Sequence, residues 1–350
     1  MGTGHYMIRE IREGPASFRE TLESLAGVED VAREIVSRYK CIVTCSSGSS
    51  HHAGLSLCYA ASRLAGFETY SVQAAEYSEH LHNILHGGHL LVAISQSGES
   101  VDTLRAARLA SGRGVDVLAV TAFPQSTLAS LARFVVGVRY GVERAVPATK
   151  SFMAQLAAAY SLALGLALAR FGRGGVEGFR GELARLPDSL AEVVGLSEGF
   201  VRGLARELAG MRHVFLLGYG PSYIAALEAS LKLKETSGIH AEAYSIREFR
   251  HGPISLLDKD VACVFIIPPE PGDCLEVFEG VGAEAEASGS HATVISHKGL
   301  DVEADLVLPG TAHAFATAVE VVPFQLLAYY TALEKSLDPD RPRRLRKVVQ

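Results

Sequence analysis

The chain has 350 residues, more than one typical domain needs and enough for two domains with separate cores. Its formal net charge is -6, and Lys and Arg form no stripe outside residues 341–347, which argues against a nucleic-acid binder. The five cysteines form no C-x-x-C pair, and charges are spread through residues 1–20. We therefore expect reduced thiols, no secretory leader and a cytoplasmic protein.

Short apolar runs of β-type composition alternate with helical segments, which predicts parallel sheets covered by helices on both faces. Residues 149–210 are almost entirely helical in pattern, and the glycine-rich stretch 171–175 is the best linker. We therefore expect an α/β protein of two domains, residues 1–172 and 173–350. The predicted strands are 41–45, 69–72, 90–95, 115–121 and 134–138 in the first half, and 213–217, 241–244, 262–267, 292–296 and 306–309 in the second.

The segment after the third predicted strand is the most informative one. It consists of Ser95, Gln96, Ser97, Gly98, Glu99 and Ser100, and a helical stretch begins at Val101. Such a loop surrounds one anion-sized hollow with hydroxyl and backbone N–H groups, and the helix dipole also favours negative charge. The spacing matches neither a nucleoside triphosphate loop nor a dinucleotide loop, so it predicts a site for a small phosphorylated metabolite. The alternative is a βα turn whose serines only cap the helix.

Residues 152–169 are apolar nearly all round and approach the length of a membrane span. Gln155, Tyr160 and Ser161 interrupt the run, many of its residues are alanine, and no second such segment follows. We therefore predict a helix buried between two domains rather than a membrane anchor.

The two halves resemble copies of one unit. A shift of 172 residues superposes Gly48 on Gly220, Ser50 on Ser222, Ala53 on Ala225, Gly66 on Gly238 and Glu76 on Glu248. The same shift places Ser95, Gln96 and Ser97 on Ile267, Pro268 and Pro269, and prolines supply no N–H group for an anion. We expect phosphate binding by the first copy and proton transfer mainly by the second.

The second copy carries the ionisable candidates. Lys232 and Glu235 lie three residues apart on a predicted helix that begins near Pro221, so they share one face of it. That helix follows the carboxyl end of a strand, where ligands bind in open α/β sheets. The alternatives are an exposed ion pair at these positions, a solvated loop histidine at His251, and a mobile tail at Lys347.

Taken together, these segments resemble the sugar isomerase (SIS) domain family. The resemblance is to the domain pair of glucosamine-fructose-6-phosphate aminotransferases and to the stand-alone glucosamine-6-phosphate deaminases, and it runs nearly end to end. It implies two tandem flavodoxin-like domains of three αβα layers. The motifs that carry it are residues 46–50, 95–104, 148–150, 226–228, 231–235, 239–244, 251–253 and 342–347.

Carried over by position, the resemblance implies two sets of site residues. The phosphate and sugar contacts would be Ser49, Ser50, Ser95, Gln96, Ser97 and Ser100, with Val146 lining the pocket. Glu235 would move a proton between C1 and C2 of the open-chain sugar, and Lys232 would serve the sugar hydroxyls. His251 would help to open the ring across a dimer interface. Lys347 would touch the carbonyl end of the sugar and could form an imine with a ketose.

We therefore expect a homodimeric enzyme that converts glucosamine 6-phosphate to fructose 6-phosphate and ammonia without a metal or another cofactor. The family's glutaminase domain does not precede the isomerase motifs, so we do not expect glutamine-driven synthesis. Four alternatives stay open: isomerisation of hexose 6-phosphates, deglycation of another amino sugar phosphate, one subunit of a split synthase, and a regulator that binds sugar phosphate. A regulator would need neither Glu235 nor Lys347. We expect neither a nucleic acid nor a membrane as a partner.

Overall fold

The computed structural model describes residues 4–347. Helices and strands alternate along most of the chain, and all ten predicted strands are present within a few residues of the expected bounds. The first half contains α1 (Tyr6–Ser24), α2 (Val28–Arg38), β1 (Cys41–Ser46), α3 (Ser49–Ala65), β2 (Glu68–Gln73), α4 (Ala74–Glu76), the π-helix η1 (Tyr77–Leu81), β3 (His89–Ile94), α5 (Val101–Gly112), β4 (Asp116–Thr121), α6 (Thr127–Leu131), β5 (Phe134–Gly137) and α7 (Lys150–Phe171). The second contains η2 (Arg173–Gly175), α8 (Glu177–Leu208), β6 (His213–Gly218), α9 (Pro221–Ser237), β7 (Ala241–Ser245), α10 (Ile246–Phe249), η3 (Pro253–Leu256), β8 (Val261–Ile266), α11 (Cys274–Ala287), β9 (His291–His297), β10 (Leu306–Leu308), η4 (His313–Phe315) and α12 (Ala316–Glu334).

The chain divides into two compact units built from interleaved segments. Among the described residues, the first unit consists of residues 13–143, 148–187 and 346–347, and the second of residues 4–12, 144–147 and 188–345. The sequence analysis places one boundary after residue 172, and this boundary stays a prediction. The interleaving arises because α1, α8 and the C-terminal tail each contribute residues to both units.

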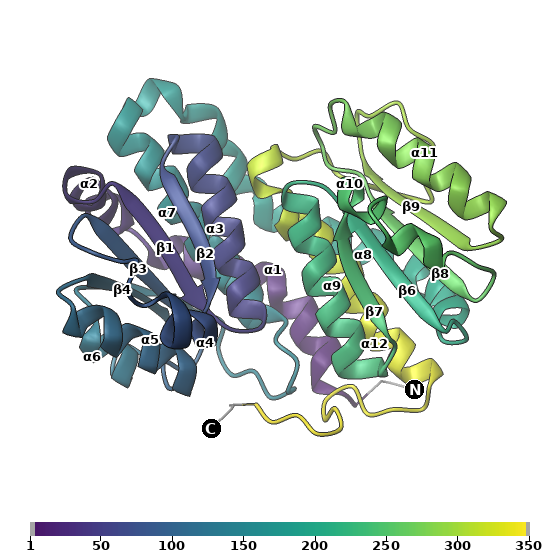
Figure 1. Ribbon diagram of the computed structural model, residues 1–350, viewed down its shortest axis with the longest axis horizontal. Coiled ribbons are helices and arrows are strands. Elements are labelled where there is room, and N and C mark those ends of the chain that lie inside the picture. Colours follow the sequence, from purple (N-terminus) through teal and green to yellow (C-terminus); the bar gives the residue numbers. More distant parts are fainter. Residues whose placement is uncertain (1–3, 348–350) are drawn as a thin grey trace. The chain divides into compact units, whose positions relative to one another are not determined.

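The first unit contains a parallel five-stranded sheet in the order β2-β1-β3-β4-β5, the strand order of flavodoxin-like folds. Figure 1 shows α3 and α7 on one side of this sheet and α5 and α6 on the other. On the α5 side, Val43, Cys45, Leu91 and Ala93 belong to one buried cluster. Burial on both faces explains why β1 and β3 are apolar over nearly their whole length.

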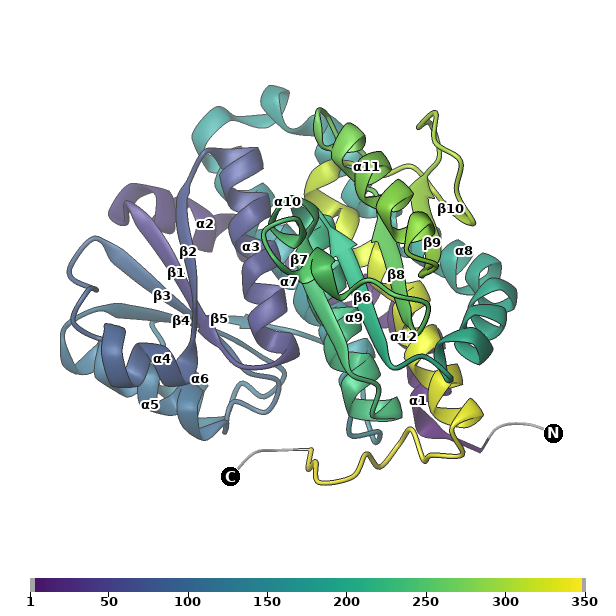
Figure 2. The same cartoon turned by 45° about the vertical axis from the view of Figure 1, so that its right-hand side comes forward.

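The second unit repeats this architecture in the order β7-β6-β8-β9-β10, again with all strands parallel. Figure 2 shows α9 and α12 on one side of this sheet, with α11 on the other. Phe265 on β8 packs against Phe278 on α11 with ring centroids 6.5 Å apart. The expected α/β fold with two tandem three-layer domains is therefore confirmed.

The predicted internal repeat is visible in matching elements. A shift of 172 residues carries β1 onto β6, α3 onto α9 and β3 onto β8 with the same bounds. Gly48 and Gly220, which precede α3 and α9, have nearly the same backbone angles (φ 58°, ψ -137° and φ 58°, ψ -128°). Gly66 and Gly238 both end their helices in the left-handed conformation, which a residue with a Cβ atom adopts only at a cost.

The apolar helix α7 is a core helix. Within the described residues it is the one helix long and apolar enough to cross a membrane, and 83% of its most apolar window is buried. Inside its own unit it packs against α2 and α3. The predicted buried helix is therefore confirmed, whereas its predicted place between two domains stays a prediction.

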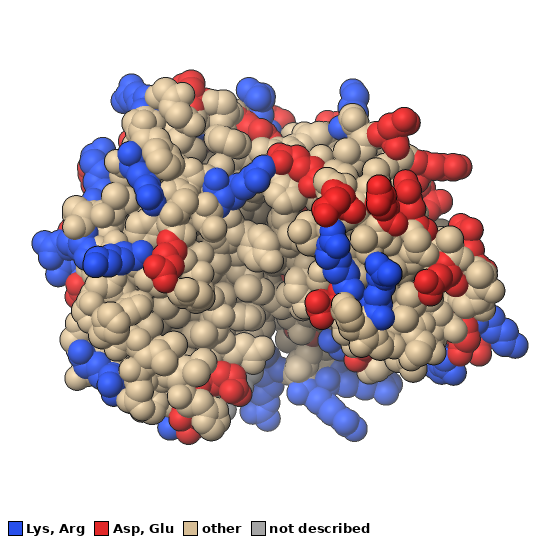
Figure 3. All heavy atoms as spheres, turned by 45° about the horizontal axis from the view of Figure 1, so that its top comes forward, with Lys and Arg blue, Asp and Glu red and all other residues tan. Residues whose placement is uncertain are grey.

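Charged residues show no broad basic surface on the face drawn in Figure 3. Among the described residues seen there, Asp and Glu side chains gather at the upper right, Lys and Arg side chains are scattered over the left part, and a few Lys and Arg side chains lie close together at the lower edge. This distribution matches the net charge of -6 and gives no sign of a nucleic-acid interface on that face.

Candidate functional site

The serine-rich segments follow the two strands at the centre of the first sheet. In the order β2-β1-β3-β4-β5, the chain continues from β1 to one side of the sheet and from β3 to the other, so the switch point lies between these two strands. Ligands of open α/β sheets bind in the crevice beyond the carboxyl ends of the strands at this point. Residues 46–50 follow β1 and residues 95–100 follow β3. We call these two segments together the phosphate cradle.

Serine hydroxyls hold the second segment of the cradle in shape. Ser95 Oγ accepts a hydrogen bond from the N–H of Gly98 at 3.1 Å and lies 3.1 Å from Ser100 Oγ. Ser97 Oγ accepts from the N–H of Glu99 at 3.1 Å. Ser100 is the N-cap residue of α5 but makes no side-chain capping bond. The serines therefore order the loop itself, which the alternative of simple helix capping does not explain.

Gly98 is required by the shape of this loop. Its φ is +69°, and a Cβ atom at this position would lie 2.2 Å from Ser126 Oγ. Any other residue would therefore be strained and would displace the turn before α6. Glycine is therefore the residue that fits this backbone conformation without strain. Ser126 is itself held in place, because its Oγ caps α6 by accepting a hydrogen bond from the N–H of Ala129.

The first segment of the cradle is fixed from α7. Ser49 and Ser50 are the first two residues of α3, and Ser50 Oγ accepts a hydrogen bond from Gln155 Nε2 at 3.0 Å. Burial, followed by the charge of His52, lowers the pKa of His51 to about 4. His51 is therefore neutral near pH 7, and the anion would meet hydroxyl and N–H dipoles here rather than an imidazolium.

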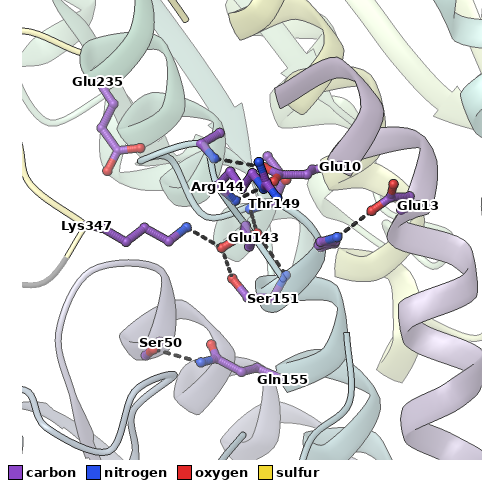
Figure 4. Close-up of polar contacts among 12 residues, drawn as sticks. Glu10, Glu13, Ser50, Glu143, Arg144, Thr149, Ser151, Gln155, Glu235 and Lys347 are labelled. Carbon is purple, nitrogen blue, oxygen red and sulfur yellow. Dashed lines mark hydrogen bonds and ion pairs between the residues drawn. The ribbon is translucent and has the colours of Figure 1, made fainter. Parts of the chain in front are cut away.

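Glu143 is a site residue that the sequence analysis missed. Its fully buried carboxylate accepts hydrogen bonds from the N–H groups of Thr149 (2.9 Å) and Ser151 (3.1 Å) and from Ser151 Oγ (2.7 Å). Its Oε2 also accepts from Lys347 Nζ at 2.6 Å, as Figure 4 shows. Thr149 makes no side-chain capping bond for α7, so Glu143 both supplies the cap and docks the tail lysine. An acidic residue shortly before an uncapped helix start was the available signal.

In the second unit, α9 carries a buried charge cluster. The Lys232 side chain is 1% exposed, and its Nζ lies 2.5 Å from Glu235 Oε2 and 3.4 Å from Glu228 Oε1. Burial disfavours the charged form of Lys232, but the two carboxylates outweigh it and raise the pKa of the lysine. Lys232 therefore stays cationic, and the alternative of an exposed ion pair does not hold, because α9 is covered by α12.

Glu235 differs from its neighbours in access to solvent. Its side chain is 20% exposed, whereas those of Lys232 and Glu228 are 1% exposed. A carboxylate that is held by a buried cation and still reachable can exchange a proton with a bound molecule. Of the three charged side chains in this cluster, Glu235 is the most accessible to solvent.

Two further expected residues lie in the second unit. His251 is exposed and follows α10, where its N–H donates to the carbonyl of Glu248 at 3.0 Å. Val146 is half-buried, and its N–H donates to the carbonyl of Asp340 at 2.9 Å. The Asp340 carboxylate accepts from the N–H groups of Tyr6 (2.8 Å) and Met7 (2.7 Å) and so caps α1. Asp340 therefore fixes Val146 and the start of the C-terminal tail to one helix end.

The expected residues are divided between the two units. The cradle serines, Gln96 and Lys347 belong to the first unit, and Val146, Lys232, Glu235 and His251 to the second. Among the described residues, no group of three or more His, Cys, Asp or Glu side chains could hold a metal ion. The first group can bind an anion and supply an amine, and the second can transfer a proton beside a fixed cation.

Comparison with known proteins shows the family of this chain. The SIS domain family matches residues 35–165 and 207–334. The glutamine--fructose-6-phosphate aminotransferase of Gloeobacter violaceus is 36% identical over 364 residues, which cover 99% of this chain and 59% of that protein. The chain therefore spans about three fifths of the length of that relative.

Two solved structures share the fold over nearly their whole length. The C-terminal domain of the glucosamine-fructose-6-phosphate aminotransferase of Francisella tularensis superposes with a TM-score of 0.85 and 31% identity, covering 97% of this chain and 99% of that one. The glucosamine-6-phosphate deaminase of Thermotoga maritima has a TM-score of 0.78 and 22% identity, covering 98% and 99%, and at this identity it shows the fold alone. With both halves matched and a relative at 36% identity, the chain belongs to the SIS domain family.

Proposed function

We propose that this protein is a phosphosugar isomerase that deaminates glucosamine 6-phosphate. The reaction converts glucosamine 6-phosphate and water to fructose 6-phosphate and ammonia. After ring opening, a proton moves from C2 to C1, while the aldehyde oxygen gains a proton and the amine nitrogen loses one, so that the C1 aldehyde becomes an alcohol and the C2 amine an imine. Water then hydrolyses this imine and releases ammonia. The protein must hold a phosphate, carry one proton over a short distance and stabilise charge on the sugar oxygen.

The buried pair of Lys232 and Glu235 carries this proposal. Removing a charged lysine from water is costly, and the carboxylates of Glu228 and Glu235 keep the buried Lys232 charged on this face of α9. Perturbed charge clusters of this kind gather at functional sites. In the proposed reaction Glu235 takes the proton from C2 and delivers it to C1, while Lys232 stabilises the developing oxyanion.

The cradle supports a phosphorylated substrate. Ser95, Ser97 and Ser100 form an ordered loop before the N-terminus of α5, and α5 has no side-chain cap of its own. Helix N-termini of this kind bind phosphate without a basic side chain. The names of the relatives, a fructose-6-phosphate aminotransferase and a glucosamine-6-phosphate deaminase, describe substrates with this group.

Lys347 and His251 complete the proposed mechanism. Lys347 would touch the carbonyl end of the open-chain sugar, after leaving or sharing the carboxylate of Glu143. A lysine that loses its proton there can attack a ketose carbonyl and form an imine, with loss of water. His251 would help to open the sugar ring in the partner subunit of a homodimer, a role that suits its exposed position.

A coupled assay tests the proposed function. Purified protein is given glucosamine 6-phosphate, and ammonia and fructose 6-phosphate are followed together, with glucose 6-phosphate as the control substrate. Equal release of both products supports the deaminase. Turnover of glucose 6-phosphate alone would replace it by a hexose-6-phosphate isomerase. Heat protection by both sugars without turnover would replace it by a regulator that binds sugar phosphate.

A second candidate is the same chemistry in the direction of amination. The aminotransferase of Gloeobacter violaceus extends well beyond the length that this chain matches, so an ammonia supply could come from outside the matched region. This candidate predicts formation of glucosamine 6-phosphate from fructose 6-phosphate and ammonium, faster than the reverse reaction. It also predicts copurification with a glutaminase.

Mixed dimers test the proposed role of His251. His251→Ala and Glu235→Gln should each be inactive alone. If His251 acts in the partner subunit, mixing the two variants restores activity in those sites that receive both intact residues. No recovery after verified subunit exchange would place His251 in its own subunit's site or outside the mechanism.

A further inference from the structure

The proposed mechanism uses Lys347 but not the six residues before it, 341–346, which we call the arginine segment. Its four arginines are Arg341, Arg343, Arg344 and Arg346, and it contains neither Asp nor Glu. The chain as a whole has a net charge of -6, so the remainder of the chain is more negative than this total. A phosphate dianion that approaches the protein is therefore repelled by most of the molecule and attracted by this segment.

The charge of the arginine segment is open to solvent. All four arginines are exposed, and among residues 4–347 none of them forms an ion pair with a carboxylate. Two other exposed arginines, Arg12 and Arg202, are paired instead, because both contact Glu198, at 2.9 and 2.8 Å. A guanidinium without a carboxylate partner keeps its field toward solvent, so the segment can act on a dissolved anion.

Arg344 holds one of these charges at a structural cost. Its φ is +66°, in the left-handed region. A residue with a Cβ atom is strained there, and glycine and asparagine adopt this conformation more readily. The backbone conformation therefore does not explain an arginine at this position, and what the residue adds is its side chain.

The arginine segment continues directly into a residue that is docked near the phosphate cradle. Lys347 Nζ lies 2.6 Å from Glu143 Oε2, and Glu143 also accepts a hydrogen bond from the N–H of Ser151, in the first turn of α7. One turn further along α7, Gln155 donates to Ser50 Oγ of the cradle at 3.0 Å. Both contacts are visible in Figure 4. The end of the segment and the cradle are thus supported by the same part of one helix.

Chain connectivity limits how far the arginines can be from this anchor. An extended chain spans at most about 3.6 Å per residue, so even Arg341 lies within about 20 Å of Lys347. The Debye length is about 20 Å at 20 mM salt and about 6 Å at 300 mM salt. The arginines therefore act on an anion in the cradle at low salt, and this action is screened at high salt.

The cradle itself lacks a basic side chain. Its two segments, residues 46–50 and 95–100, contain no Lys or Arg, and the second contains Glu99. Hydroxyl and N–H dipoles hold a phosphate at contact distance, but their attraction falls off faster with distance than that of a full charge. Attraction over a longer range has to come from charges outside the cradle.

We propose that the arginine segment is an electrostatic guide, which draws phosphomonoester dianions to the phosphate cradle without touching the bound phosphate. The guide raises the local concentration of the ligand, and the cradle holds it. This inference rests on the proposed function only in naming a phosphosugar as the ligand. The guide requires binding of that ligand and does not require its turnover.

Calorimetric titration with fructose 6-phosphate at pH 8, where the phosphate is a dianion, tests the proposal. One variant replaces all four arginines of the segment by glutamine. Its affinity should be about fivefold lower than that of the wild-type protein at 20 mM NaCl and less than about 1.5-fold lower at 300 mM NaCl, as expected for four charges about 15 Å from a dianion. A second variant replaces the same four arginines by lysine and should bind like the wild-type protein at both salt concentrations, because a guide needs charge and not a planar guanidinium.

A matched control removes four positive charges from the opposite edge of the first sheet. These residues are exposed, lie near the N-terminal ends of β1, β2 and β4, and are replaced by glutamine: Arg38, Lys40, Arg63 and Arg113. The affinity of this variant should change by less than about twofold at either salt concentration, because these charges are further from the cradle.

The single variant Arg344→Asn separates charge from structure. Asparagine fits the φ of +66° with less strain, so the Tm should be equal to that of the wild-type protein or higher. The affinity for fructose 6-phosphate at 20 mM NaCl should nevertheless fall by about 1.5-fold, because one of four charges is lost. A purely structural role of Arg344 does not predict this combination.

Three results would overturn the proposal. The first is a glutamine variant that binds like the wild-type protein at 20 mM NaCl, and the second is one weakened equally at both salt concentrations. The third is a lysine variant as weak as the glutamine variant, which would indicate direct contact by guanidinium groups. If the predicted salt pattern is found without turnover in the coupled assay, only the proposed function fails. If the wild-type protein does not bind fructose 6-phosphate, inorganic phosphate replaces it as the probe, and a lack of salt-dependent binding there contradicts the guide as well.

Discussion

Lys347 Nζ lies 2.6 Å from Oε2 of Glu143, whose side chain is fully buried at the start of α7. This contact joins two residues that are 204 positions apart in the chain. The same carboxylate holds the N–H groups of Thr149 and Ser151, so the position of the tail lysine is tied to the first turn of α7.

Glu143→Gln should release the tail. The amide can still accept from the N–H groups of α7 but has no charge to hold the ammonium of Lys347, so trypsin should cleave the segment 341–347 several times faster than in the wild-type protein. Limited proteolysis followed by mass spectrometry measures this rate. Glu13→Gln is the matched control, because it removes the partner of Lys150 in the same unit without touching the tail. Equal cleavage in Glu143→Gln and wild type would show that the ion pair does not dock the tail.

Glu235→Gln should lower kcat by about 10²–10⁴-fold while leaving the Kd of fructose 6-phosphate nearly unchanged. The change removes a proton carrier and little ground-state binding. Glu228→Gln is the control on the same helix: it also contacts Lys232, at 3.4 Å, and its side chain is 1% exposed. We expect a smaller loss of kcat in that variant. Full activity of Glu235→Gln would remove Glu235 from the mechanism.

Ser97→Ala combined with Ser100→Ala should raise KM by about tenfold or more, with a smaller change in kcat. Two hydroxyls that hydrogen-bond a phosphate dianion contribute at least 1.4 kcal/mol between them, or about tenfold in affinity. Initial rates over a range of substrate concentration separate the two constants. Ser130→Ala provides the control, since that hydroxyl donates to Thr127 on α6, outside the cradle. An unchanged KM in the double variant would refute the cradle assignment.

The low pKa of His51 predicts a loss of stability in mild acid. Burial lowers this pKa to about 4 from an ordinary value of 6.5, so between these values the unfolded chain binds a proton that the folded chain does not. His51 therefore costs no stability above pH 6.5, and its contribution to the free energy of unfolding becomes unfavourable as the pH falls toward 4. If the whole pKa shift of His51 acted on the free energy of unfolding, the loss of stability at pH 4 would be about 3 kcal/mol. Solvent screening at this partly exposed ring reduces the expected loss to about 2 kcal/mol.

His51→Asn should therefore lose less stability than the wild-type protein between pH 6.5 and pH 4. Urea unfolding at several pH values measures the difference, because other acidic groups contribute equally to both proteins. His86→Asn serves as the control, since His86 is exposed. Parallel curves for wild type and His51→Asn would mean that the imidazole is not buried in its neutral form.

Local patterns in the sequence were sufficient to predict most of the fold. Most of the predicted strands are short apolar runs bounded by turn residues, as sheets buried on both faces require, whereas the edge strands β2 and β7 also carry polar residues. The repeat was visible in the sequence through its glycines. Gly48 and Gly220 both have a positive φ, which few other residues tolerate, so the same residue type stands at both positions. The burial of Lys232 was not visible, because it depends on α12, which lies far along the chain.

The polar contacts of the site were predictable only in part. The serine loop was visible as a motif, since its hydrogen bonds connect neighbours such as Ser95 and Gly98. The contact between Glu143 and Lys347 was not visible, because these residues are 204 positions apart, although an acidic residue shortly before the uncapped start of α7 was a local signal for Glu143. The interleaved units were missed for the same reason: Asp340 caps α1 across 333 residues of sequence.

Hydrogen exchange at C1 of fructose 6-phosphate tests the central claim most directly. The protein is incubated with this sugar in D₂O, with and without ammonium chloride, and the C1 protons are followed by NMR. We predict that one C1 proton exchanges in the presence of ammonium, and that Glu235→Gln abolishes the exchange. Exchange without ammonium would indicate simple aldose-ketose isomerisation by the same site. If wild-type protein leaves both C1 protons in place under both conditions, the proposed proton transfer by Glu235 is wrong.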